Sequence, residues 1–546
     1  MTPTQRWTLV AAILGSTVVF LDATVVNVAL PAISEDLDAG LAGQQWVVEA
    51  YLLALVALLL VGGSFGDKFG RKLMFISGLV GFGVTSALCA IAPTTEVLIA
   101  ARALQGIAGA LLVPGSLALV ASAFDGEERG RAVGMWTAWT GIATVIGPAG
   151  GGFLVDQLDW RWIFWVNVPL IAATVLLTLR HVEESKDPDA VPGIDWVGIA
   201  LSALGLGGPV FALIEQPTYG WSDPIVFVPL VGGIVLFALF ILWELRAAHP
   251  MLELSLFRVR NFAVANMATL AAYAGLMGGF FFITLFLQQT AGYSALEAGL
   301  ATLPTSLALF LLSPRFGRMA SGTGPRLPMT VGPIVGGIGL LMFMRVDPSP
   351  DYLTEVLPAV VVFGLGISAM VAPLTATVLD SVDERHTGIA SGINNGVSRV
   401  AGLLAIAILG AVIAGQFSAA IDDGLVGVDL GPAAEDVVDD AQAKPLAVPE
   451  TTGLDPADAT AVAAAATNAS ESSFDLGMAL AGALMVAGGI VAGVGIRNPR
   501  RSRPHDESAP RAATAGECGR CGGDPAGAGA HDGEPRAEPA PEPAPA

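Results

Sequence analysis

Long apolar stretches alternate with short polar segments along the whole chain. A helix that crosses a membrane needs about 20 predominantly apolar residues. Fourteen stretches meet this requirement, so the pattern predicts an all-α integral membrane protein. The predicted spans are residues 7–30, 44–64, 73–92, 96–122, 132–155, 160–180, 195–214, 224–245, 262–287, 296–313, 328–345, 356–379, 387–416 and 473–495.

The distribution of Lys and Arg predicts how these spans are oriented. Cytoplasmic segments of membrane proteins are enriched in these residues. If the N-terminus is cytoplasmic, only three of the 27 Lys and Arg residues fall in outer segments: Arg161, Arg345 and Lys444. Two more, Arg102 and Arg399, lie within spans. We therefore predict that both termini are on the cytoplasmic side.

Two segments are too polar to cross a membrane. Residues 417–472 contain one Lys and eleven Asp or Glu residues, and we expect an outer acidic loop with a brief helix in the Ala-rich stretch 459–468. Residues 496–546 begin with four Arg residues and become rich in Pro, Ala, Gly and Glu. Such a composition cannot bury a hydrophobic core, so it predicts a disordered cytoplasmic tail.

A degenerate repeat divides the chain. The loops at 63–72 and 317–326 each carry two glycines seven residues apart, with Ser321 in the second loop at the place of Asp67. Each loop follows the second span of a six-span block, and repeated halves are usual in secondary transporters. A chance likeness between two Gly-rich loops is the alternative. The predicted divisions are a six-helix bundle in residues 1–181, an inserted helix pair in 195–246 and a six-helix bundle in 262–495.

Composition excludes several classes of protein. Charged residues make up only 14% of the chain, against about 25% in soluble domains. A net charge of −21 argues against nucleic-acid binding, which needs a basic surface. The sequence contains no P-loop for ATP and no H-E-x-x-H metal motif. The lone C-x-x-C of Cys518 and Cys521 is a weak zinc signal. We expect no enzyme activity, no cofactor and no bound metal.

Among the charged residues inside predicted spans, three stand out: Asp22, Glu49 and Arg102. A charge near the centre of a membrane costs about 2.5–3.5 kcal/mol on insertion scales, and such a residue usually has a function. On the predicted topology the three residues lie about 12, about 8 and about 9 Å from the outer ends of their helices. We therefore expect one polar layer in the outer half of the N-terminal block.

This layer predicts a proton site. Desolvation opposes ionisation of a carboxyl group whereas a nearby Arg favours it, so a carboxylate held between these effects can bind and release a proton. The hypothesis is that Asp22, Glu49 or both carry the coupled proton and that Arg102 tunes them. A static Asp22–Arg102 ion pair is one alternative. For Glu49 the alternatives are snorkelling to the outer surface and attraction of a cationic substrate.

Polar side chains elsewhere in the spans are candidates for a substrate cavity. Asn395 and Arg399 are four residues apart and share a helix face. Arg399 lies about 18 Å from the inner end of its helix. Hydrogen bonding between helices is the alternative role for these groups. Four phenylalanines at 280–282 and 286 either line an apolar pocket or pack against lipid and other helices. The candidate cavity residues are Asn27, Gln105, Gln288, Asn395 and Arg399.

Several segments resemble motifs of the major facilitator superfamily, and within it of the fourteen-span drug:proton antiporter family. The resemblance covers nearly the whole chain apart from the outer loop and the tail. It implies a major facilitator fold with 14 transmembrane helices in two six-helix bundles plus an inserted helix pair. The segments that carry it are Leu21–Pro31, Gly63–Lys72, Arg102–Gly106, Gly147–Gly152 and Trp160–Pro169.

The resemblance also implies roles for two motifs. In the family, the loop after the second span latches the two halves together in one conformation, and the Gly-Pro feature of the fifth span is associated with export. The alternatives are an ordinary positive-inside loop and a generic helix kink. The matching latch residues are Gly63, Asp67, Gly70, Arg71 and Lys72, and the matching antiporter-motif residues are Gly147, Pro148, Gly151 and Gly152.

Together the residues and the resemblance predict a proton-coupled antiporter. It exports small amphipathic compounds or drugs across the plasma membrane by alternating access, with a small-molecule substrate, protons and the lipid bilayer as its partners. We expect a monomer. The first alternative is a dedicated exporter of one endogenous metabolite, lipid or siderophore. A solute importer and a membrane sensor are further alternatives.

Overall fold

The structure is a computed structural model that describes residues 1–186, 195–247, 250–383 and 386–498. In these residues the regular structure is helical and no β-strand occurs. Within this described part of the chain, fourteen helical segments are long and apolar enough to cross a membrane. The prediction of an all-α membrane fold with 14 transmembrane helices is therefore confirmed. The boundaries of the two bundles stay a prediction, and the predicted tail beyond residue 498, with Cys518 and Cys521, lies outside the described residues.

The first six spans contain seven helices, because a one-turn helix opens the sixth span. These helices are α1 (Pro3–Leu37), α2 (Leu41–Phe69), α3 (Arg71–Ala90), α4 (Thr95–Ala123), α5 (Gly126–Gln157), α6 (Trp162–Trp165) and α7 (Asn167–His181). The next two spans are α8 (Trp196–Tyr219) and α9 (Pro224–Glu244). These two helices pack against each other, and α8 also contacts α2 and α14.

The last six spans include short π-helical and 3₁₀ segments at some of their ends. In chain order the elements are η1 (Leu254–Arg258), α10 (Arg260–Leu285), η2 (Phe286–Thr290), α11 (Ala295–Thr323), α12 (Arg326–Met342), η3 (Phe343–Arg345), η4 (Tyr352–Val356), α13 (Leu357–Asp380), α14 (Thr387–Gly424), α15 (Pro432–Ala443) and α16 (Pro456–Gly495). Of these, α15 is a short helix that does not span.

Capping signals in the sequence explain where several helices begin. The hydroxyl of Thr2 and the side chain of Gln5 form a capping box at the start of α1, and Ser294 and Glu297 form another at the start of α11. Each box satisfies two backbone N–H groups that would otherwise lack partners. Aspartates accept backbone N–H groups at the starts of three more helices, α8, α9 and α16.

The acidic segment 417–472, which the sequence predicts as an outer loop, contains more helix than predicted. α14 continues to Gly424 and α16 begins at Pro456, so much of segment 417–472 is an extension of two spans. Ala has the highest helix propensity, and Asp455 caps the first turn of α16, which explains why the Ala-rich stretch joins the last span. Phe417 and Ile421 of α14 pack against α15 and α16 in a small hydrophobic cluster.

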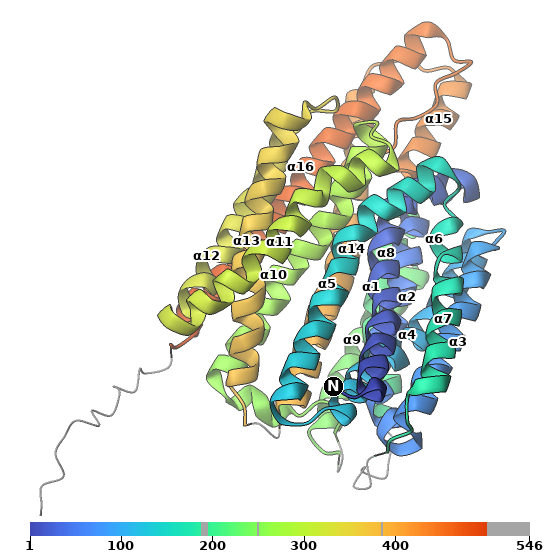
Figure 1. The fold of residues 1–546 in the computed structure, drawn as a ribbon. Coiled ribbons are helices and arrows are strands. Elements are labelled where there is room, and N and C mark those ends of the chain that lie inside the picture. Colours follow the sequence, from blue (N-terminus) through green and yellow to red (C-terminus); the bar gives the residue numbers. More distant parts are fainter. Residues whose placement is uncertain (187–194, 248–249, 384–385, 499–546) are drawn as a thin grey trace, which may run out of the picture. The chain divides into compact units, whose positions relative to one another are not determined.

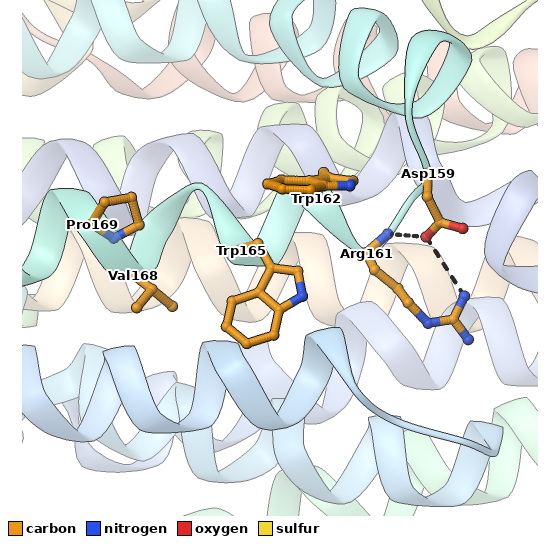
Figure 2. A pocket seen from close by; sticks show the side chains of 6 residues that line it. All are labelled: Asp159, Arg161, Trp162, Trp165, Val168 and Pro169. Atoms are coloured by element: carbon orange, nitrogen blue, oxygen red, sulfur yellow. Dashed lines mark hydrogen bonds and ion pairs between the residues drawn. The ribbon is translucent and has the colours of Figure 1, made fainter.

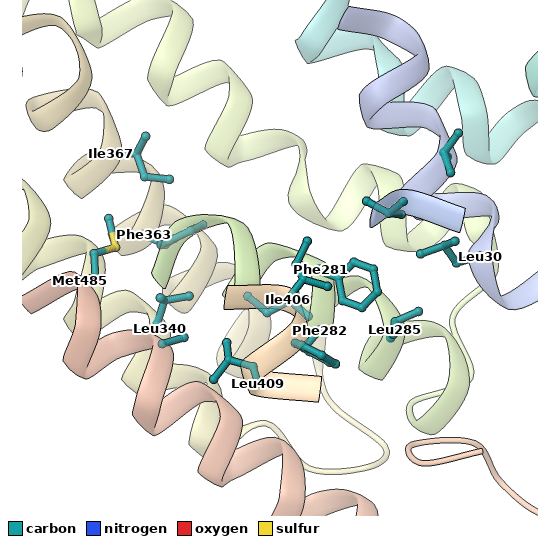
Figure 3. Close-up of a cluster of buried hydrophobic side chains, with 14 of the residues drawn as sticks. Leu30, Phe281, Phe282, Leu285, Leu340, Phe363, Ile367, Ile406, Leu409 and Met485 are labelled. Atoms are coloured by element: carbon teal, nitrogen blue, oxygen red, sulfur yellow. The ribbon is translucent and has the colours of Figure 1, made fainter. Parts of the chain in front are cut away.

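The largest hydrophobic core includes buried side chains of α10, α12, α13, α14 and α16 (Figure 3). Phe281 and Phe282 on α10 are buried, with ring centroids 4.9 Å apart. Phe286 stacks on Phe474 of α16 at 3.9 Å. Of the two interpretations of these phenylalanines, packing between helices is the one that the structure shows for these three.

The turns that follow α1, α3 and α5 meet at the end of the helices that carries α15, which we call the α15 end (Figure 1). Thr95 at the start of α4 donates to the carbonyl of Leu37 at 3.3 Å. The indole of Trp160 donates to Asp36 at 3.2 Å, and Arg161 forms an ion pair with Asp36 at 2.8 Å. On the predicted topology, the α15 end faces the outside of the cell.

Candidate functional site

Asp22 and Arg102 form a buried ion pair between α1 and α4. Nη1 of Arg102 lies 2.6 Å from Oδ2 of Asp22, and each residue is 1% exposed. Nε of Arg102 donates to the carbonyl of Val47 on α2 at 3.0 Å, and the guanidinium lies 4.3 Å from the ring centroid of Tyr51. A buried ion pair is tolerated when such additional contacts use its remaining hydrogen-bonding capacity.

Amide and hydroxyl groups complete the surroundings of Asp22. Gln105 Nε2 and Asn167 Nδ2 both donate to Asp22 Oδ1, at 3.1 and 3.3 Å. Gln105 Oε1 accepts from Arg102 Nη1 at 2.7 Å, and Asn167 Nδ2 also donates to Ser86 Oγ at 3.1 Å. The structure thus joins Asp22, Arg102 and Gln105, which the sequence singles out, with Asn167 and Ser86, which sequence reasoning missed.

Glu49 is buried on α2, apart from this network. Its side chain is fully enclosed, and neither carboxylate oxygen has a hydrogen-bond partner among the described residues. One turn earlier, Gln45 Nε2 donates to the carbonyl of Ile406 on α14 at 2.7 Å. A side chain with no exposed surface does not snorkel to the outside. The expected polar layer therefore contains the hydrogen-bonded Asp22 network and, separately, an unpaired Glu49.

The remaining cavity candidates are not joined into one site by the described hydrogen bonds. Arg399 Nε donates to Asn395 Oδ1 at 3.2 Å, as their spacing on α14 predicts. The amides of Asn27 and Gln288 donate to carbonyl groups one turn earlier in the chain. A role in substrate binding stays a prediction for these four residues.

The predicted latch loop is a tight connection between α2 and α3. Gly70 adopts φ 124°, a conformation that side chains rarely allow. Asp67 Oδ1 accepts hydrogen bonds from Nε and Nη2 of Arg71 at 2.9 and 2.7 Å. The backbone N–H of Lys72 donates to Glu184, beyond α7, at 2.9 Å. These contacts all lie within the first 186 residues, and the latching role stays a prediction.

The glycines of the predicted antiporter motif let α5 approach two neighbours closely. A Cβ atom at Gly147 or Gly151 would collide with side chains of α1. Gly152 faces α11, where a Cβ would lie 2.6 Å from the backbone Cα of Leu296. Pro148 lies within α5, and its carbonyl lies against Gly299 of α11. The motif thus packs against helices from both blocks of spans.

A carboxylate that the sequence analysis did not single out links the same two helices. Near the end of α5, Asp156 accepts the backbone N–H groups of Ala295 and Leu296 at 3.1 and 2.9 Å. These groups form the N-terminus of α11, where unpaired N–H groups and the helix dipole favour an anion. Sequence spacing cannot reveal this contact, since the partners are about 140 residues apart.

Lys444, which follows α15, connects the acidic segment 417–472 to the turn between α1 and α2. Its Nζ lies 2.7 Å from Asp38 and 3.0 Å from Asp440. The hydrogen bond from Lys444 lowers the pKa of Asp38 below its ordinary value of 3.8. The hydrogen bond to Asp38 raises the pKa of Lys444 above 10.5. Both groups therefore stay charged at every physiological pH.

We expect the contact between Lys444 and Asp38 to be insensitive to pH between about 5 and 8. An acid with a lowered pKa stabilises the contact until the pH falls through that lowered value, and a base with a raised pKa does so until the pH rises through its own. The distribution of distances between spin labels at the exposed Leu158 and Val426 should be the same at pH 5 and pH 8. This distribution should become broader in Lys444→Gln. A change with pH as large as the change in Lys444→Gln would contradict this assignment.

A surface pocket of about 420 Å³ lies at the start of the sixth span, separate from the Asp22 network (Figure 2). Its lining is mainly apolar apart from one exposed pair, in which Asp159 accepts the backbone N–H of Arg161 at 2.8 Å. No lining residue hydrogen-bonds to Asp22 in the described part of the chain. We therefore do not place the transport site there. The lining residues are Asp159, Arg161, Trp162, Trp165, Val168 and Pro169.

Comparison with known proteins agrees with this architecture. A sequence profile of the Major Facilitator Superfamily matches residues 12–406. The multidrug resistance protein Stp of Mycobacterium tuberculosis (strain CDC 1551 / Oshkosh) is 36% identical over 426 residues, which cover 78% of this chain and 79% of Stp. The tetracenomycin C resistance and export protein of Streptomyces glaucescens is 31% identical over 518 residues, 93% of this chain and 95% of that protein.

A solved structure supports the same fold. A bacterial homologue of the human lysosomal transporter Spinster, in an inward-facing and unoccupied conformation, aligns over 91% of this chain and 100% of its own, with a TM-score of 0.61 at 16% identity. Fold, sequence profile and relatives together describe a multi-pass membrane transporter rather than an enzyme. The chain belongs to the Major Facilitator Superfamily.

Proposed function

We propose that this protein is a proton-coupled antiporter that exports small amphipathic compounds or drugs across the plasma membrane by alternating access. The observation that carries the proposal is the buried Asp22–Arg102 pair inside the spans. Ionisable residues inside membrane spans usually pair with one another, and they mark proton relays and transport pathways. The names of the relatives, which include multidrug resistance and antibiotic export proteins, support export.

We assign the coupled proton to Asp22. A proton on Asp22 removes the countercharge of Arg102, and a buried cation without a countercharge is strongly unfavourable. The helices that carry the pair, α1 and α4, must then rearrange or admit water. Proton binding and conformational change are linked in this way, as coupling requires. The buried and unpaired Glu49 is the second carboxylate available for a proton or a cationic group of the substrate.

The contacts between the first and the last six spans support one state of the transport cycle. The described hydrogen bonds that Gln45 and Lys444 donate and that Asp156 accepts join the two blocks at the α15 end. Toward the other end, a Cβ at Gly134 of α5 or Gly396 of α14 would meet no described atom within 4 Å. On the predicted topology, this arrangement is closed to the outside. In the opposite state, we propose that the latch loop around Asp67 engages the second block.

The test of this proposal is gradient-driven efflux of ethidium from proteoliposomes of controlled orientation. Asp22→Asn is expected to lower the initial rate by at least about tenfold, because the neutral amide cannot exchange a proton. Ethidium counterflow without a pH gradient should persist, since it needs no net proton movement. Asp36→Asn is the matched control, because Asp36 lies on the same helix in an exposed ion pair, and its rate should match the wild type.

The outcomes separate the parts of the proposal. Equal gradient-driven rates in wild type and Asp22→Asn would remove Asp22 from coupling, and Glu49→Gln then tests the second acid. Efflux that does not respond to a pH gradient in the wild type would contradict proton coupling itself.

A dedicated exporter of one endogenous compound is the second candidate function. The relative that matches most of the chain's length among those described above is named for resistance to, and export of, a single antibiotic. A panel of structurally unrelated amphipathic cations, anions and neutral compounds distinguishes the two functions. Transport of several classes supports broad export. Transport of none, with a pH-gradient response to extracts of the host's own metabolites, supports the dedicated exporter.

A further inference from the structure

The hydrogen bonds around Asp22 fit an ionised carboxylate. Oδ2 accepts from Arg102 Nη1, and Oδ1 accepts from Gln105 Nε2 and Asn167 Nδ2. Both amides must present their NH₂ groups, because an amide oxygen turned toward a carboxylate would be repelled. Every partner of Asp22 is thus a donor, and the arrangement holds no group that accepts a hydrogen bond from a protonated Asp22.

One polar atom of the residues that hydrogen-bond to Asp22 is left without a partner. Oδ1 of Asn167 is buried and accepts no hydrogen bond from the described residues. The whole side chain of Asn167 is 1% exposed, so bulk water does not reach it. Buried acceptors almost always have a partner, and an exception calls for an explanation.

The other acceptors near Asp22 are already in use. Gln105 Oε1 accepts from Arg102 and from the Cys89 thiol. Ser86 Oγ accepts from Asn167 and Gln105 while it donates to the carbonyl of Phe164. The titratable and charged groups that face Asp22 from the packed helices are Arg102 on α4, Cys89 on α3 and Tyr51 on α2. Tyr51 Oη also lacks a partner, but Tyr51 faces Arg102 with its ring and makes no hydrogen bond to Asp22.

We infer that Asn167 is a positioning residue whose side-chain amide turns over when Asp22 takes up a proton. With Asp22 ionised, Asn167 Nδ2 donates to it, as the structure has it. With Asp22 neutral, the rotated amide places Oδ1 at the same position, where it accepts the Asp22 O–H. The rotation breaks the hydrogen bond from Asn167 Nδ2 to Ser86 Oγ. The proton stays on Asp22, and no covalent bond of Asn167 changes. This inference rests on the proposed role of Asp22 in proton coupling.

Protonation of Asp22 and rotation of the Asn167 amide also change how strongly Arg102 is attracted to α1. In the ionised state, Asp22 is held by donors from α4 and from the start of α7, so α1, α4 and α7 are tied together. A neutral Asp22 that donates to Asn167 keeps its contact with α7, while its attraction to Arg102 of α4 is lost. Asn167 therefore keeps α1 joined to α7 in both protonation states, while the attraction between α1 and α4 weakens when Asp22 is neutral.

Infrared difference spectroscopy tests the inference without any substrate. We compare purified protein at acidic and neutral pH, with and without isotopic labelling of the asparagine side-chain carbonyl. The wild type should show a label-sensitive amide carbonyl band that changes with the same pH midpoint as the carboxyl band of Asp22. That amide band should be missing in Asn167→Leu and in Asp22→Asn. It should remain in Asn394→Leu, because Asn394 belongs to a separate amide network with Asn266 and Thr269.

A transport measurement distinguishes positioning from a structural role. Asn167→Leu should lower gradient-driven ethidium efflux by at least tenfold and leave counterflow within about twofold of the wild type. Asn167→Thr should recover most of the efflux, because a hydroxyl can both donate and accept. If Asn167→Leu does not fold, Asn167→Thr and the wild-type spectrum still provide the test.

Three results would overturn the inference. The wild-type spectrum could lack a label-sensitive amide band, Asn167→Leu could keep that band, or efflux and counterflow could fall equally in Asn167→Leu. If instead the Asp22 carboxyl band itself does not respond to pH, the proposed coupling role of Asp22 fails and the inference fails with it. A responding carboxyl band with a silent amide refutes the role of Asn167 alone.

Discussion

Replacing Arg102 by leucine is expected to lower the free energy of unfolding by about 3–5 kcal/mol, because removal of one partner leaves the other charge buried and unpaired. Asp22 is 1% exposed and would keep only its two amide donors. The cation–π contact with Tyr51, at 4.3 Å, would also be lost. The measurement is denaturant unfolding in mixed micelles, followed by the fluorescence of the native tryptophans.

Two further variants test whether the loss of unfolding free energy in Arg102→Leu is electrostatic. The double variant Asp22→Asn/Arg102→Leu removes both charges, and it should recover much of the lost stability. Arg161→Leu removes an exposed partner of Asp36 and should cost only about 0–1 kcal/mol. If Arg102→Leu and Arg161→Leu lowered the free energy of unfolding equally, the loss of the buried ion pair would not cost more than the loss of an exposed one.

Gly152→Val is expected to prevent the two blocks from closing at the α15 end. The added Cβ would meet the backbone of Ala295 and Leu296, which cannot move aside as a flexible side chain can. Overpacking of this kind costs about 1–3 kcal/mol or more. A cost of about 3 kcal/mol would make closed molecules roughly 150-fold rarer, and efflux should fall to a similar extent because the cycle needs both states.

Gly150, two residues before Gly152 on α5, provides the matched control. A Cβ at Gly150 would meet only the side chain of Ile146 at 3.7 Å, an ordinary contact, so Gly150→Val should retain efflux. Spin labels at the exposed Leu158 and Leu353 report the separation of the two blocks. Their distance should increase in Gly152→Val and stay unchanged in Gly150→Val. Equal behaviour of the two variants would mean that this contact does not limit closure.

Much of the fold follows from local sequence. Each span can be predicted from a single apolar stretch, and the caps at Thr2 and Ser294 mark where two of the helices begin. The extension of α16 was missed because hydropathy ends a span where polarity rises, while helix propensity continues through the alanines before residue 473. The length of an apolar span and the length of the helix that contains it depend on different physical properties.

The site was predictable only in part, for a related reason. A charge in an apolar span is conspicuous by itself, so Asp22 and Arg102 stand out from composition. Asn167 and Ser86 are small polar residues that many membrane helices contain. Their importance comes from the atoms opposite them, which are 145 and 81 residues away along the chain. Pairings of that kind arise from packing and leave no local pattern.

The lengths of the chain between partners imply an order of assembly. Asp22 is separated along the chain from Arg102 by 80 residues and from Asn167 by 145. The ion pair and the amide hydrogen bonds to Asp22 can therefore be complete once the sixth span has been synthesised. The contacts that close the α15 end wait far longer, with 361 residues between Gln45 and Ile406 and 406 between Asp38 and Lys444. During synthesis, the N-terminal segments generally fold first. The buried charges are thus neutralised early in biogenesis. The contacts between the two blocks, on which the proposed transport cycle depends, are the last to form.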